Sequence, residues 1–99
     1  MNDDQRRSLK QRVIAARAVR QVRAVVRHGQ HYVNKYSYRT QPERDALALA
    51  VRRGWLRVSR GRRHYIAKAA NLPTEAEQEQ ILEAASDPRW PKPKGGWGS

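Results

Sequence analysis

The sequence predicts a mainly helical α+β domain with one small β-hairpin, and three observations lead to this fold class. The first 28 residues contain neither Gly nor Pro and repeat apolar residues at helical spacing. The pattern Thr-x-x-Glu, which often opens a helix, occurs at Thr40 and again at Thr74. Between these positions, apolar and polar residues alternate on both sides of an arginine-rich turn, which is typical of a hairpin.

Residues 3–28 are expected to form a long N-terminal amphipathic helix. Asp3 and Asp4 lie at its start, where acidic side chains interact favourably with the helix dipole, and Gly29 is suited to end it. On a helical wheel, apolar and basic residues fall on opposite sides. The apolar side holds Ile14, Ala15, Ala18, Val19, Val22, Val25 and Val26, and the basic side holds Arg6, Lys10, Arg12, Arg17, Arg20, Arg23 and Arg27.

The segment 30–39, QHYVNKYSYR, does not reveal its own conformation. Tyr32, Tyr36 and Tyr38 are spaced among polar residues, a pattern that fits a short helix, an extended strand or an ordered loop. A second helix is expected to follow over 41–53. It begins with the capping box at Thr40, has Pro in its first turn, and carries an apolar stripe of Leu47, Ala50 and Val51.

The alternating residues after Gly54 are expected to pair as the hairpin. A two-residue turn at Gly61 and Arg62 and a four-residue loop give the same register. That register places Val58 opposite Tyr65 and Leu56 opposite Ala67. These four side chains form the expected inner face, while Arg57, Ser59, His64 and Ile66 point outward.

The chain is expected to divide into a domain over 1–70, an acidic helix within 71–87 and a flexible tail over 88–99. Thr74 opens the acidic helix, which is expected to end near Ser86 and carries a narrow apolar stripe of Ile81, Leu82 and Ala85. The tail is rich in Pro, Gly and Trp, a composition that does not form a packed core.

Charge is distributed unevenly along these parts. The net charge is +12, but residues 1–70 hold 18 Lys and Arg against four acids, whereas 71–87 hold five acids and no Lys or Arg. Sixteen of the 21 basic residues are Arg, which contacts phosphate and guanine in a bidentate manner. No acid lies between Asp4 and Glu43 to pair with the arginines of the first helix. This pattern favours a polyanionic partner, such as duplex DNA or RNA.

The order of a long helix, an undecided segment, a capped helix, a glycine and a basic hairpin resembles the winged helix-turn-helix family of DNA-binding proteins. The likeness covers residues 8–70 and is strongest from Thr40 to Lys68, in AVRRGWLRVSRGRRHYIA. It implies a winged-helix-like nucleic-acid-binding domain, with helix 41–53 in the major groove and an Arg-rich wing at 60–63 on the backbone. The family has two helices ahead of its recognition helix, and here only one is evident.

The resemblance and the charge pattern together suggest the residues that contact nucleic acid. Gln41 and Arg44 would face bases, Arg52 and Arg53 would approach phosphates, and Arg60, Arg62 and Arg63 would form the wing. Other candidates are Lys35, Arg39, Arg57, Arg20, Arg23 and Arg27. The three tyrosines of 30–39 are candidates for stacking on unpaired bases or donating to phosphates, with packing against the first helix as the alternative.

The resulting prediction is a small basic DNA-binding protein that regulates transcription, of bacterial, phage or plasmid type. The alternative is a phage or mobile-element modulator that binds an acidic host protein, RNA or a ribonucleoprotein. No catalytic set, metal-ligand spacing or cofactor motif is evident, so we expect neither an enzyme nor a cofactor. The lack of cysteine and of long apolar runs suggests a cytoplasmic protein, nucleoid-associated if it binds DNA, with no membrane contact.

The valine-rich side of the first helix is too long for one helix and a hairpin to cover. The acidic helix carries the opposite charge and the apolar pair Ile81 and Leu82. It is therefore expected either to fold back on the basic domain of its own chain or to dock on a second copy. The second arrangement would give a homodimer with paired recognition helices.

Overall fold

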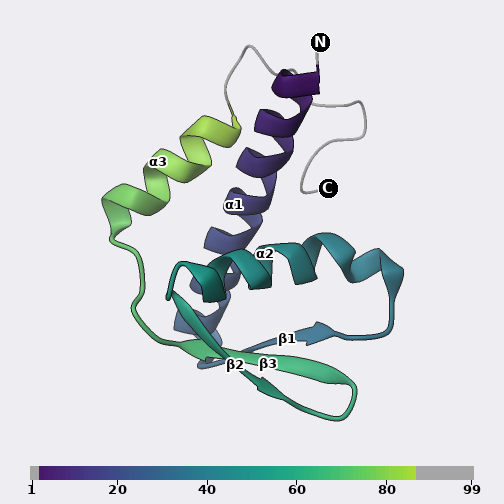
Figure 1. Cartoon of the computed structure of the whole chain (residues 1–99). Helices are drawn as coiled ribbons and strands as arrows, with labels where there is room; N and C mark the ends of the chain where they lie inside the picture. The colour runs from purple at the N-terminus through teal and green to yellow at the C-terminus, as the bar shows by residue number, and fades with distance from the viewer. Residues whose placement is uncertain (1–2, 87–99) are drawn as a thin grey trace.

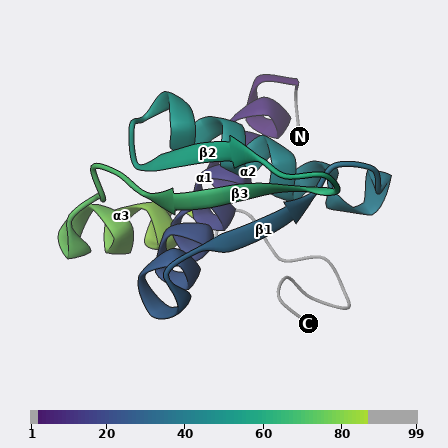
Figure 2. The ribbon, with the colours of Figure 1, turned by 90° about the horizontal axis from the view of Figure 1, so that it is seen from below.

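The computed structural model describes residues 3–86 as an α+β fold in which helices lie on one side of a three-stranded antiparallel sheet (Figures 1 and 2). The elements in chain order are α1 (Asp3–His28), β1 (His31–Asn34), the 3-10 helix η1 (Tyr38–Thr40), α2 (Gln41–Arg52), β2 (Leu56–Arg60), β3 (His64–Ala69) and α3 (Glu75–Ala85). The tail predicted over 88–99 lies outside the described residues.

Helix α1 has the predicted bounds and supplies much of the core. Val19, Val22 and Val25 are buried and pack with the inner faces of α2 and the sheet. Val26 contradicts the predicted apolar side, because 63% of it is exposed. It lies beyond Arg23, where the first turns of α3 meet α1, and α3 therefore does not cover it.

The undecided segment forms a strand followed by a single 3-10 turn. Strand β1 pairs with β3 and places Tyr32 opposite Ile66 and Val33 opposite Tyr65. The sheet order is therefore β1-β3-β2, and the predicted two-stranded hairpin gains a third strand. Val33 is the one fully buried residue of this four-residue strand. A single buried position gives no alternation of apolar and polar residues, so the sequence pattern was too weak to predict the strand.

Helix α2 begins at Gln41 as predicted and ends at Arg52, one residue before the predicted end, but it does not begin through the predicted capping box. Thr40 Oγ1 donates to the carbonyl oxygens of Asn34 (3.0 Å) and Ser37 (2.7 Å) and makes no cap bond to α2. The 3-10 turn runs directly into α2, and the backbone N–H of Gln41 already donates to Tyr38. The prediction failed because Thr40 is the last residue of the 3-10 turn and its hydroxyl is engaged with Asn34 and Ser37 instead of the N–H groups of α2.

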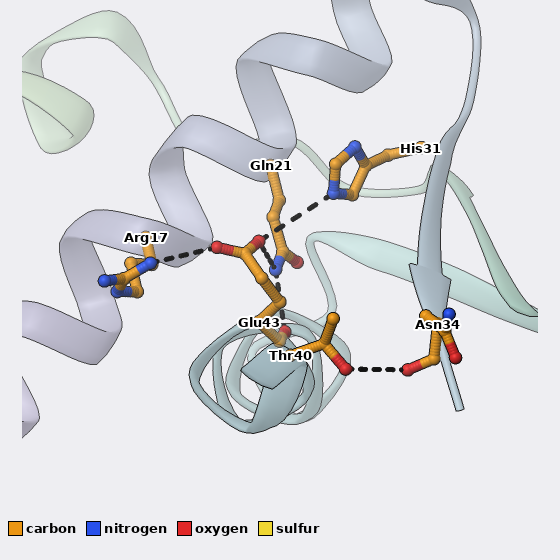
Figure 3. Close-up of polar contacts among 6 residues, drawn as sticks. All are labelled: Arg17, Gln21, His31, Asn34, Thr40 and Glu43. Atoms are coloured by element: carbon orange, nitrogen blue, oxygen red, sulfur yellow. Dashed lines mark hydrogen bonds and ion pairs between the residues drawn. The ribbon is translucent and has the colours of Figure 1, made fainter. Parts of the chain in front are cut away.

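Glu43, the other half of the expected box, instead joins α2 to α1 (Figure 3). Its carboxylate accepts hydrogen bonds from Arg17 (3.0 Å) and Gln21 (3.0 Å), and the Gln21 amide also donates to its carbonyl oxygen at 2.7 Å. His31 Nε2 lies 3.9 Å from the same carboxylate.

The packed side of α2 is formed by Ala46, Leu47 and Ala50. Val51, predicted for that stripe, is 43% exposed.

The hairpin has a different register from the predicted one. Val58 pairs with Ala67 rather than Tyr65, and Leu56 pairs with Ala69 rather than Ala67. The backbone N–H of residue 61 donates to the carbonyl of residue 64 at 2.8 Å, which places the turn at residues 62–63, one position later than expected. A shift of two residues keeps each side chain on its face, so the predicted inner residues still contact the core.

Helix α3 confirms the prediction for the acidic segment. Thr74 Oγ1 accepts from the backbone N–H of Glu77 at 3.2 Å, and the helix stops at Ser86. Its apolar pair, Ile81 and Leu82, packs against the core beside α1 (Figure 1). The helix therefore folds back on its own chain, which is the first of the two predicted arrangements.

Candidate nucleic-acid interface

The β1–α2 connection and the β2–β3 turn lie at the same end of the sheet, opposite the end from which the chain leads to α3 (Figures 1 and 2). Lys35 joins them, because its backbone N–H donates to Arg63 O (3.0 Å) and its ammonium group to Gly61 O (2.7 Å). The hydroxyl of Tyr36 donates to Arg62 O at 3.2 Å. We call residues 34–39, 41–44 and 60–63 the basic end.

The guanidinium groups of the turn remain open to solvent. Arg60, Arg62 and Arg63 are exposed, as is Arg39 on the connection. Among residues 3–86, no carboxylate forms an ion pair with any of these four side chains. The backbone of the turn is thus fixed by hydrogen bonds while its charged groups stay available to an anionic ligand.

Gln41 and Arg44, predicted to face bases, lie together in the first turns of α2. Arg44 is half-buried and donates to the carbonyl of Lys35 (2.8 Å) and to Gln41 Oε1 (2.7 Å). Gln41 is exposed and donates its amide to Asp45 at 2.8 Å. Arg44 therefore holds the β1–α2 connection against α2, and Gln41 is the more accessible of the two. Lys35 is also engaged internally, with its ammonium group 5.2 Å from the centre of the Tyr65 ring.

The remaining predicted residues lie away from the basic end. Arg52 and Arg53 are exposed near the other end of α2, about 18 Å from its start at 1.5 Å per residue. Arg57 is exposed on β2. On α1, Arg23 donates to Gln78 (2.9 Å) and pairs with Glu79 (3.0 Å), whereas Arg20 and Arg27 are exposed. The structure therefore divides the predicted set among several surfaces.

The outer face of the sheet is a surface that the sequence did not single out. Figure 2 shows it uncovered by the helices, which lie behind the strands. Tyr32 is 52% exposed on β1, and Tyr36 and Tyr38, in the connection, are 74% and 80% exposed. These exposures contradict the predicted alternative in which the tyrosines pack against α1. Tyr32 lies on this face because β1 pairs with β3. These two strands are far apart in the chain, so the local sequence pattern did not indicate the surface.

Among residues 3–86, no cluster of His, Asp and Glu is arranged to hold a metal ion. No helix in that range is both long and apolar enough to cross a membrane. The described surface instead offers exposed arginines and aromatic rings. Comparison with protein-family models, curated proteins and solved structures finds no match to this chain.

Proposed function

We propose that the chain binds duplex DNA through the basic end and acts as a small regulator of transcription. The start of α2 would enter the major groove, and the β2–β3 turn would lie on the phosphate backbone. The observation that carries this proposal is the attachment of the turn to the β1–α2 connection through Lys35 and Tyr36. It gives the exposed arginines a fixed position relative to the first turn of α2.

The charge balance of this region supports a polyanionic ligand. Residues 31–69 contain ten Lys and Arg and two acids, Glu43 and Asp45. Both acids are engaged within the protein, Glu43 with Arg17 and Gln21 and Asp45 with Gln41. The arginines of the turn therefore face solvent without local neutralisation, and phosphate groups would supply the missing negative charge.

Two side chains at the start of α2 would have different roles, one in contacting a base and the other in positioning the first. Gln41 is exposed and carries both a donor and an acceptor, the pair of groups with which Gln reads adenine in the major groove. Arg44 is anchored at two points and positions Gln41 through the bond to its side-chain oxygen. The N-terminus of α2 also favours nearby phosphate through the helix dipole.

Replacing Arg60, Arg62 and Arg63 together by Ala tests the proposal. The turn is exposed and held by backbone bonds, so the fold should persist while affinity falls for every duplex sequence. The matched control replaces Arg6, Arg7 and Lys10, which are exposed on α1 and carry the same total charge. We expect the control to keep most of its affinity in fluorescence anisotropy titrations. Equal losses in the two variants would show that only net charge matters.

A further inference from the structure

The outer face of the sheet combines aromatic rings with cations at one place. Strand pairing sets Tyr32 opposite Ile66 and Asn34 opposite His64, so these side chains are close neighbours across β1 and β3. The Tyr32 and His64 rings lie edge to face, with their centres 6.0 Å apart and their planes at 81°. Gln30 donates a hydrogen bond to the Tyr32 hydroxyl, which limits the orientations open to that ring.

A hollow of about 520 Å³ opens beside these rings at the turn. Its lining consists of Tyr32, Tyr36, Gly61, Arg62, Arg63, His64 and Ile66. The hydroxyl bond to Arg62 O holds the Tyr36 ring at this site. The hollow thus has aromatic and apolar walls and a rim of two exposed guanidinium groups.

This chemistry fits an unpaired nucleotide. A nucleobase in a duplex has both faces stacked on its neighbours, so an aromatic side chain reaches them only where the base is unpaired or flipped out. Stacking on tyrosine or histidine uses the face of any base, and guanidinium groups bind the adjoining phosphate. The three strands carry no Asp or Glu that would repel that phosphate.

We propose that the outer sheet face binds an unpaired nucleotide, with its base against Tyr32, Tyr36 and His64 and its phosphate on Arg62 and Arg63. This inference rests on the proposed function, because the same arginines would hold the backbone of a neighbouring duplex. The preferred ligand is then DNA in which a duplex adjoins a single-stranded segment. The start of α2 would contact the duplex part and the sheet would contact the unpaired part.

The test compares a blunt DNA duplex with the same duplex carrying an oligothymidine overhang. Tyr32→Ala with Tyr36→Ala should lower the preference for the overhang substrate over the blunt duplex by roughly five- to 150-fold, the range for loss of stacking on one base. Tyr32→Ala alone leaves the Tyr36 bond to the turn in place and should leave blunt-duplex binding unchanged. Tyr32→Phe with Tyr36→Phe should retain the preference. Tyr38→Ala is the control, because Tyr38 is exposed but does not line the hollow. Free oligothymidine and oligouridine in separate titrations distinguish DNA from RNA as the source of the unpaired nucleotide.

The outcomes test the unpaired-nucleotide site separately from the proposed binding of duplex DNA. Photocrosslinking of 5-iodouracil in the overhang to Tyr32 or Tyr36 would support it directly. If the arginine variant loses duplex affinity while the tyrosine variant binds both substrates as wild type does, the proposed function stands and the stacking site is wrong. If Tyr36→Ala alone, which removes one exposed ring, also leaves the overhang preference intact in a protein with wild-type melting, the inference is overturned.

Discussion

The basic end and the α1–α3 interface use the same residue type in opposite ways. At the interface, Arg23 donates to Gln78 and pairs with Glu79, and close by Arg17 pairs with Glu43 of α2. At the basic end, Arg62 and Arg63 contribute their carbonyl oxygens to internal hydrogen bonds while their guanidinium groups face solvent. Arg17 and Arg23 therefore hold elements together where an acid is opposite, whereas Arg62 and Arg63, which face no acid, remain available to a ligand.

This difference shows why net charge alone is a weak guide to a binding surface. Arg23 belonged to the predicted nucleic-acid contacts because it lies on the basic side of α1. Gln78 and Glu79 of α3 occupy its guanidinium group, through contacts between positions 55 and 56 residues apart in the chain. Substitutions in the two regions should therefore separate stability from binding.

The largest effect is expected from Ile81→Asp combined with Leu82→Asp. Both side chains pack against the core between α3 and α1, so the substitutions place two carboxylates at an apolar interface. We expect a loss of about 2–4 kcal/mol in the free energy of unfolding, measured by thermal and urea denaturation. Gln80→Asp with Ala84→Asp is the control, since both positions are exposed on the same helix. Similar melting of the two variants would mean that α3 does not stabilise the fold.

The next effect concerns base recognition at the start of α2. Gln41→Ala should cost about 1–3 kcal/mol of binding free energy at one base pair and leave other positions unchanged. Arg44→Ala should relax the preference at the same position, because Arg44 orients Gln41, and should also lower the melting temperature. Competition titrations with duplexes that differ at single base pairs measure both effects. Losses that do not depend on the duplex sequence would argue against groove recognition by α2.

A smaller effect is expected from Glu43→Ala. The carboxylate accepts from Arg17 and Gln21 across the α1–α2 contact but is partly exposed, which weakens these bonds. We expect a loss of about 1–2 kcal/mol in unfolding free energy. Duplex affinity should change little for the protein that remains folded. A full loss of binding at a temperature well below the melting point would indicate that Glu43 organises the basic end as well.

The smallest effect is expected from Arg23→Ala. Its ion pair with Glu79 is exposed, and such pairs contribute about 0–1 kcal/mol. Duplex affinity should fall less than for Arg62→Ala, a single substitution with the same change of charge. If Arg23→Ala weakened binding more than Arg62→Ala, α1 rather than the basic end would be the principal contact with DNA.

The sequence was sufficient for elements that depend on local signals. The Gly-free amphipathic run predicted α1, and Thr74 with its acidic first turn predicted α3. The capping box at Thr40 predicted the right start for α2 by the wrong contact, because the Thr40 hydroxyl bonds to Asn34 and Ser37 and Glu43 reaches α1 instead. The inner face of the hairpin was predicted correctly although the register was wrong. The register differs by two residues, and a shift of two keeps each side chain on the same face of the sheet.

Features that depend on pairing between distant segments could not be predicted in the same way. Strand β1 has little apolar pattern and is defined by its bonds to β3. The approach of Tyr36 to Arg62 follows from that pairing and joins positions 26 residues apart. The arginines of the turn were therefore identifiable as a group, but their proximity to the tyrosines was not.

The most direct test of duplex binding at the basic end is the slope of log K against log salt concentration. If about five cations contact phosphates, a fourfold rise in salt should weaken wild-type binding by several hundredfold. The Arg60, Arg62 and Arg63 triple alanine variant should show a slope smaller by about 3 units, while the Arg6, Arg7 and Lys10 control keeps the wild-type slope. Tight binding that does not depend on salt, or an equal change of slope in both variants, would contradict the proposal.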